Sequence, residues 1–219
     1  MLVDLYEAMR CAPTSRRFKP DSVPREDLLR ALDAARFAPS GGNRQGWRVV
    51  VVEDAERRAA LRDLYLPPWR AYLEQTGGAR MLAEPESFDA VRVRMVRRAD
   101  EYANGLDSVP VHLVVGVRLS DLAVTDAALP RQSIVGGASV YPFVQNLLLA
   151  LRAEGLGAAM TTLLVPAEAQ VRQLLGVPEE IALAAHIGVG YRVEEWPKRL
   201  SRKPIEDFTF AERYGEPLR

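Results

Sequence analysis

The feature that most constrains the fold is a set of four apolar runs of strand length, separated by longer stretches of other pattern. They cover residues 47–53 (WRVVVVE), 111–117 (VHLVVGV), 158–164 (AAMTTLL) and 181–190 (IALAAHIGVG). The first two are rich in β-branched residues, which is typical of buried strands. Helices and strands are mixed without a strict alternation, so the sequence favours an α+β protein over a doubly wound sheet.

Helical spacing of apolar residues predicts the helices that accompany these strands. The clearest spans about 138–154, and Gly155 supplies its left-handed stop. Asp54 is the expected N-cap of a short helix that ends at Tyr65. Residues 66–104 have a poor pattern, with two polar helical pieces. Three further helices are expected at about 3–10, at 24–38 and in a short stretch that ends at Gly176.

The chain shows no internal repeat and no linker, so a single domain over residues 1–219 is predicted. Its 29 basic and 29 acidic residues balance, which argues against a general nucleic-acid binder. The apolar stretch 140–151 is interrupted by polar residues, and none reaches membrane-spanning length. The single cysteine, Cys11, cannot form an intrachain disulfide. We therefore expect a cytoplasmic protein without nucleic-acid or membrane partners.

Several common site motifs are missing from the sequence. No phosphate-binding P-loop and no metal-ligand spacing occurs, and His112 and His186 each lie inside an apolar run. Both histidines are therefore predicted to be satisfied core residues. The Gly-x-Gly pairs in 154–160 and 186–192 lack the third glycine of a dinucleotide-binding turn. The sequence thus predicts neither a metal centre nor a Rossmann-type site.

Three polar segments could bind a ligand together. Residues 14–19 (TSRRFK) place cations beside hydroxyls, a combination that suits a phosphate. Residues 38–47 (APSGGNRQGW) combine glycines, which allow close approach of a ligand, with donors and acceptors. Residues 201–205 (SRKPI) form a small cationic site in the tail. Each also has a simpler explanation, as a solvated loop, a helix-to-strand turn and a solvated tail, and the residues alone leave both open.

Taken in order, five segments of the chain resemble the FMN-dependent nitroreductase family, and within it a branch common in actinobacteria. The segment APSGGNRQxW is the most specific of them, and the resemblance is weakest between about residues 66 and 106. The five segments cover residues 14–29, 34–52, 145–164, 174–191 and 201–208. The resemblance implies a mixed sheet flanked by helices, in a domain-swapped homodimer whose two subunits both contact FMN. The tail from about 191 to 219 would then be an arm that crosses to the partner.

The resemblance also implies roles for individual residues. Arg16 would lie beside the N1–C2 carbonyl edge of the flavin, where a cation stabilises the negative charge of the reduced form. Arg202 would bind the phosphate. The first loop arginine of the family falls on Ala12 here, and Arg10 is the expected replacement. The complete predicted FMN-binding set is Arg10, Thr14, Ser15, Arg16, Arg17, Pro39, Ser40, Gly41, Gly42, Asn43, Gln45, Thr161, Thr162, Leu163, Arg202 and Lys203.

Within this set, residues 39–43 would come from the second subunit, and 161–163 would lie beside the flavin N5. The family sequence QPW is QGW here, at residues 45–47, which loosens the turn. The segment 66–104, with Trp69, Tyr72 and Phe88, is expected to cover the site.

The implied reaction is ping-pong electron transfer from NADH or NADPH, through FMN, to an electron-poor acceptor of the nitroaromatic or quinone type. The flavin carries this chemistry, so no catalytic side chain is expected. Three alternatives stay open: a flavin storage or sensing protein, an enzyme that cleaves reduced flavin with oxygen, and an α+β interaction domain without flavin.

Overall fold

The computed structural model describes residues 3–218, so positions 1, 2 and 219 of the predicted domain lie outside the described residues. Four strands form one sheet in the order β1-β2-β4-β3, and all three strand pairs are antiparallel. The strands are β1 (Trp47–Val52), β2 (Val111–Arg118), β3 (Gly157–Thr161) and β4 (Ile181–Gly190). The apolar runs at 111–117 and 181–190 form the two central strands, and nearly all their residues are buried.

The two edge strands differ from their predictions. The run at 47–53 was expected to be buried, but β1 pairs on one side only, so Arg48 and Val51 are exposed. The strand β3 ends at Thr161 rather than at residue 164. The chain turns there, because the Leu163 amide donates to Thr161 Oγ1 at 3.2 Å.

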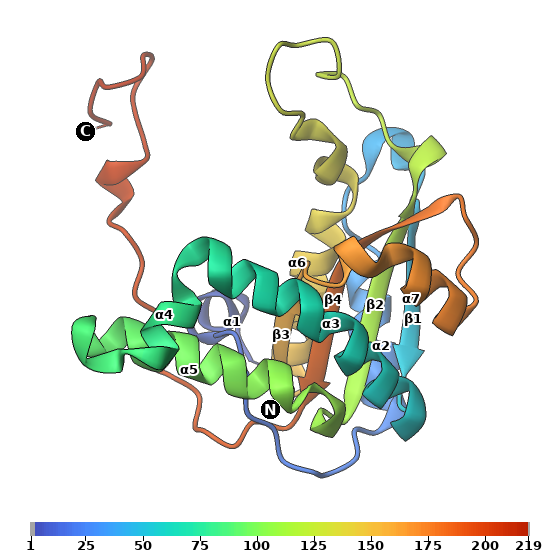
Figure 1. The fold of residues 1–219 in the computed structure, drawn as a ribbon. Helices are drawn as coiled ribbons and strands as arrows, with labels where there is room; N and C mark the ends of the chain where they lie inside the picture. Colours follow the sequence, from blue (N-terminus) through green and yellow to red (C-terminus); the bar gives the residue numbers. More distant parts are fainter. Residues whose placement is uncertain (1–2, 219) are drawn as a thin grey trace.

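Helices cover both faces of the sheet (Figure 1). One face packs against α2 (Arg25–Ala35) and α6 (Tyr141–Ala153), and the other packs against α3 (Ala55–Thr76), α5 (Ala90–Asn104) and α7 (Glu168–Leu175). The remaining helices are α1 (Leu5–Cys11) and α4 (Gly78–Ala83). The predicted α+β class, a sheet flanked by helices, is confirmed.

The helix α3 is twice as long as the sequence indicated. It was predicted to end at Tyr65, but it continues through Pro67 and Pro68 to Thr76. Prolines inside a helix normally weaken it, because they remove a hydrogen-bond donor and crowd the preceding turn. Here four buried side chains spaced by four residues stabilise the helix through their packing: Leu61, Tyr65, Trp69 and Leu73. The poorly patterned segment 66–104 is thus helical along most of its length.

A loop covers the free edge of β3. Thr14 forms an isolated parallel bridge with Ala158, and the Ser15 amide donates to the Ala158 carbonyl at 2.8 Å. This parallel bridge is isolated, and the four strands themselves pair only in the antiparallel direction. The contact fixes the cation-rich loop 14–19 against β3.

Two segments extend away from the sheet and helices. One lies between β2 and α6, and the other is the C-terminal tail, drawn in red (Figure 1). The Leu200 amide anchors the start of the tail by donating to the Arg10 carbonyl at 2.8 Å. Over residues 3–218, none of the helices has the length and apolar character that crossing a membrane requires.

Candidate functional site

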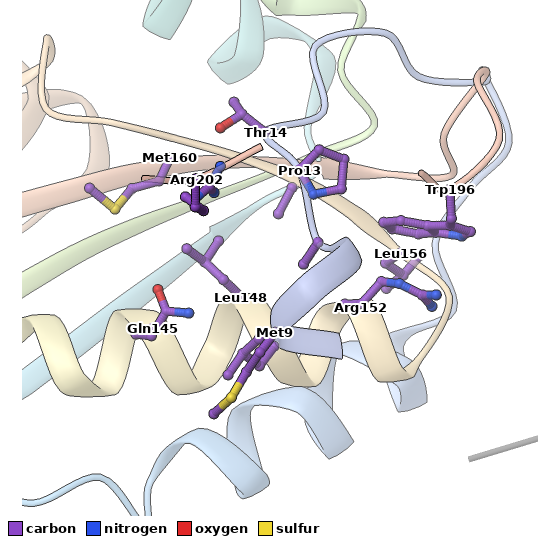
Figure 2. Close-up of a pocket in the computed structure, with 13 residues that line it drawn as sticks. Met9, Pro13, Thr14, Gln145, Leu148, Arg152, Leu156, Met160, Trp196 and Arg202 are labelled. Carbon is purple, nitrogen blue, oxygen red and sulfur yellow. The ribbon is translucent and has the colours of Figure 1, made fainter. Parts of the chain in front are cut away.

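Two adjoining cavities lie along the free edge of β3. The first, which we call the cationic lobe, has a volume of about 240 Å³ and lies between α1, α6, β3 and the tail. Figure 2 shows its lining, with Arg152 beneath Trp196 and with Gln145 and Leu148 along the same side of α6. Its lining residues are Met9, Ala12, Pro13, Thr14, Gln145, Leu148, Leu149, Arg152, Leu156, Ala158, Met160, Trp196 and Arg202.

The second cavity, the aromatic lobe, has a volume of about 400 Å³ and lies between the loop 14–16, α3, α5 and the end of β3. Four aromatic side chains and one cation line it. Its lining residues are Thr14, Arg16, Tyr65, Trp69, Tyr72, Ala99, Tyr102, Ala159, Met160, Thr161, Thr162 and Leu163.

The two lobes form one elongated site. Thr14 and Met160 line both of them. Among the described residues that line the two lobes, none is an aspartate or a glutamate. An anion is therefore favoured at the cationic end, and a flat aromatic group is favoured at the other. The site fits a ligand that carries a phosphate at one end and a ring system at the other.

Two arginines in the cationic lobe region contact one tryptophan ring. The guanidinium carbon of Arg152 lies 4.0 Å from the ring centroid of Trp196, and that of Arg192 lies 4.8 Å away. Arg192 also donates to Ser15 Oγ at 2.6 Å. Burial lowers the pKa of Arg192. Arg152 is buried, yet its Nε has no hydrogen-bond partner among the described residues.

The aromatic lobe is held by hydrogen bonds between its walls. Trp69 Nε1 donates to Asp100 Oδ1 at 2.8 Å, which ties α3 to α5. The Tyr65 hydroxyl lies 3.3 Å from Thr161 Oγ1, which ties α3 to the end of β3. The Tyr102 hydroxyl occupies space that the missing side chain of Gly188 leaves. Burial raises the pKa of Tyr102, so the phenol stays protonated.

A stacked histidine pair lies beneath this lobe. His112 Nδ1 and His186 Nε2 are 2.7 Å apart, and His112 Nε2 lies 3.0 Å from the Leu106 carbonyl. Since that carbonyl can only accept, His112 donates through Nε2 and accepts through Nδ1 from His186. Burial lowers the pKa of both imidazoles, that of His112 to about 4.

The prediction of core histidines is confirmed, with one difference. Each ring partners the other, and His186 Nδ1 has no partner among the described residues. Across residues 3–218, no group of three or more His, Cys, Asp or Glu side chains could hold a metal ion.

Six residues of the predicted FMN-binding set line the two lobes. They are Thr14, Arg16, Thr161, Thr162, Leu163 and Arg202. Four others lie close by but line neither lobe. Ser15 is buried, and the Arg17 guanidinium lies 3.6 Å from the carboxylate of Glu194. Arg10 and Lys203 line a neighbouring groove along the tail.

The other predicted residues, 39–43 and Gln45, lie elsewhere and line neither lobe. The Gly41 amide donates to Ser139 Oγ at 3.0 Å, so this loop packs beside the segment that precedes α6. Asn43 and Gln45 both have a positive φ, of 53° and 52°, and Gln45 Nε2 donates to Asn43 Oδ1 at 3.0 Å. This tight, polar loop does not reach the lobes of its own chain.

Sequence reasoning missed five polar or aromatic lining residues: Tyr65, Tyr102, Gln145, Arg152 and Trp196. For two of them a signal was present. Gln145 and Arg152 are seven residues apart in the helix α6, on the side that carries Leu148, so two polar residues interrupt an otherwise apolar stripe. Of the segment expected to cover the site, Trp69 and Tyr72 line the aromatic lobe, whereas Phe88 does not.

A family model described as the nitroreductase family matches residues 13–191. The chain belongs to the nitroreductase family. It is 33% identical to the NADH dehydrogenase of Thermus thermophilus, with 87% of each chain covered. It is 31% identical to the 5,6-dimethylbenzimidazole synthase of Rhodospirillum rubrum, over 83% of this chain and 79% of the relative.

Among solved structures, that of an oxidized iodotyrosine deiodinase bound to FMN and 3-iodo-L-tyrosine superposes with a TM-score of 0.65 at 27% identity. The match covers 95% of this nitroreductase-family chain and 100% of the deiodinase. The predictions of the family, of its fold and of FMN-dependent oxidoreduction are confirmed. The three relatives carry different names, so likeness alone does not decide the electron acceptor.

Proposed function

We propose that the two-lobed site binds FMN, with the phosphate in the cationic lobe and the isoalloxazine ring in the aromatic lobe. The observation that carries the proposal is the pair of cavities that share Thr14 and Met160, with arginines at one end and aromatic rings at the other. The absence of carboxylates from the described lining of both lobes supports it, because a carboxylate would repel the phosphate. The FMN found in the deiodinase structure adds support from a relative.

Within this site the chain's own residues bind and orient the ligand. Arg202 supplies a cation to the phosphate end. Arg16 places a positive charge at the edge of the aromatic lobe, where it stabilises negative charge that develops during electron transfer. The segment 161–163 borders the ring, and its conformation is fixed by the bond from the Leu163 amide to Thr161. When bound, FMN itself supplies the electron-transfer chemistry.

We propose further that NADH or NADPH is the donor and that an electron-poor nitroaromatic or quinone is the acceptor, each using the same open face in turn. The aromatic walls formed by Trp69 and Tyr72 suit flat, apolar substrates. The test is the visible spectrum of the purified protein, titrated anaerobically with each nicotinamide and then with a nitroaromatic or a quinone.

Bleaching by a nicotinamide and recovery with either acceptor is the expected result. Flavin that does not bleach would favour storage of FMN. Bleached protein that ignores both acceptors, yet breaks down its flavin in air, would favour an enzyme that cleaves reduced flavin with oxygen.

The placement of FMN is tested by its affinity for variants of the two lobes. Arg16→Ala and Arg202→Ala should each weaken FMN binding about ten- to a hundredfold, since each removes a charge-assisted contact of about 1.5–3 kcal/mol. Arg17→Ala, in the same loop but paired with Glu194, is the matched control and should bind normally. Normal FMN affinity in both lobe variants would contradict the placement.

We also propose that a second copy of the chain supplies the segment 39–45 to the site. Support comes from the resemblance of this segment to a flavin-binding motif and from its position away from the lobes of its own chain. Arg16→Ala and Asn43→Ala chains can be refolded together as a test. Random pairing of a two-fold dimer should restore tight FMN binding in about a quarter of the sites, because a mixed dimer has one site with both residues intact. No recovery in the mixture would contradict a shared site.

A further inference from the structure

The cationic lobe contains an arginine whose charge is not neutralised by any other residue between positions 3 and 218. Arg152 stands in the last turn of α6, and only 7% of it is exposed. Its Nε is buried without an acceptor, and its guanidinium takes part in no ion pair within the described chain. A buried cation that lacks a counter-ion destabilises a protein, so its presence here calls for an anionic ligand.

Two arginines on other helices, both more exposed than Arg152, are paired. Arg30 donates to Glu154 Oε2 at 2.8 Å, two residues from Arg152 in the sequence. Arg172 of α7 lies 3.0 Å from Glu168 Oε1 and also donates to backbone carbonyls. Glu154 is thus already paired with Arg30. The helix provides a carboxylate nearby, but Arg152 does not contact it.

Packing holds Arg152 in place for a ligand. The Trp196 ring covers its guanidinium at 4.0 Å, and Figure 2 shows the side chain lying beneath that ring at one end of the lobe. A cation stacked on an indole keeps its in-plane N–H groups free to donate. Two such N–H groups can bind two oxygens of one phosphate.

Arg10, the residue expected from the sequence to supply this charge, is placed differently. Its guanidinium lies over the Tyr6 ring at 5.9 Å, on α1. It lines the groove along the tail and not the lobe that contains Ala12. Arg10 thus lines the neighbouring groove, which it shares with Arg202, whereas Arg152 lines the lobe itself.

We propose that Arg152, positioned by Trp196, is a ligand of the FMN phosphate in this protein beside Arg202, and that Arg10 is dispensable for it. This inference rests on the proposed binding of FMN in the two lobes. It places a phosphate contact at the end of α6, and none at Arg10, which precedes the cation-rich loop 14–19. Trp196 acts through Arg152, so it is a positioning residue.

The test compares the affinities of the full-length apoprotein for FMN and for riboflavin, which lacks the phosphate, by quenching of flavin fluorescence. Arg152→Gln should weaken FMN binding about ten- to a hundredfold and leave riboflavin binding unchanged. Arg10→Gln is the matched control and should alter neither affinity. Arg152→Lys should recover part of the FMN affinity, and Trp196→Leu should lower FMN affinity alone, by less than Arg152→Gln does.

Thermal unfolding of each apoprotein variant identifies any that fail to fold. If Arg152→Gln fails to fold, Arg152→Lys replaces it in the test. Equal losses of FMN and riboflavin affinity in Arg152→Gln would show a structural role and overturn the inference. So would a selective loss in Arg10→Gln. In both cases the wild-type protein still binds flavin, and the proposed function stands. A wild-type protein that binds neither flavin would instead contradict the proposed function itself.

Discussion

The two lobes of the site are built from different kinds of structure. The aromatic lobe is walled by α3 and α5, with side chains such as Trp69 and Tyr102 that also belong to the hydrophobic core on that face of the sheet. The cationic lobe takes Trp196 and Arg202 from the tail, whose residues are half-buried or exposed. One lobe is therefore part of the core, and the other is completed by a segment that packs over it.

This difference separates two kinds of mutational effect. Substitutions in the aromatic lobe should lower the free energy of unfolding, because they remove core contacts together with site contacts. Substitutions in the cationic lobe should change ligand affinity with a smaller effect on stability, because the tail side chains bury less apolar surface.

The largest expected effect comes from a pair of tryptophan variants. Trp69→Ala should lower the free energy of unfolding by about 3–5 kcal/mol, since it empties a buried site and removes the bond to Asp100. Trp196→Ala should cost roughly 1–2 kcal/mol, chiefly from its contacts with two arginines. Urea unfolding of the two apoproteins measures both values. Equal losses would remove the distinction between the lobes.

The next effect concerns pH, through the histidine pair beneath the aromatic lobe. Burial lowers the pKa of both groups, that of His112 to about 4, whereas the unfolded chain titrates near 6.5. Above pH 6.5 the two histidines are neutral in both the folded and the unfolded chain, and stability is at its maximum. Below it the unfolded chain binds protons that the folded chain does not, so stability falls as the pH approaches 4. The slope should reach about 1.4 kcal/mol per pH unit for each histidine.

Urea unfolding at pH 7.5, 6.5 and 5.5 checks this prediction. A His186→Asn variant should lose part of the pH dependence, because one of the two titrating groups is gone. Stability that stays constant from pH 7.5 to 5.5 in the wild type would show that the imidazoles titrate normally. It would also show that this part of the core is open to water.

The smallest effect is expected from a single hydroxyl. Tyr65→Phe removes the contact with Thr161 and should lower the free energy of unfolding by about 0.5–1.5 kcal/mol. Tyr72→Phe is the control on the same helix, because Tyr72 is 46% exposed. Loss of its hydroxyl should change the free energy of unfolding by less than about 0.5 kcal/mol. Identical values for the two variants would mean that the hydroxyl of Tyr65 does not tie α3 to β3.

The fold could be predicted from the sequence where burial was complete. Continuous apolar runs predicted β2 and β4, and the period of α6 predicted that helix to within a few residues. Prediction failed where tertiary packing opposed local preference. The helix α3 runs through Pro67 and Pro68 because its buried stripe packs against the sheet, and a proline pair in isolation indicates the opposite.

The site was predictable in part, for a similar reason. Thr14, Arg16 and Arg202 stand in short polar motifs, and the structure gathers them at one edge of the sheet. Tyr65 stands inside a helix whose pattern is dominated by the core, so nothing local distinguishes it from a packing residue. Arg152 interrupts the apolar stripe of α6, but this interruption alone does not indicate a cavity. Only the fold shows that the ends of these helices face a cavity.

The contact between the loop 14–19 and β3 has a consequence for association between molecules. A strand at the edge of a sheet has unpaired amides and carbonyls that can pair with another chain. Here the Ser15 amide donates a hydrogen bond to the Ala158 carbonyl, so part of the free edge of β3 is paired within the chain. A substitution that detaches this loop would disturb the site and would also expose unpaired backbone groups at the edge of β3. Precipitation of the protein is its first expected effect.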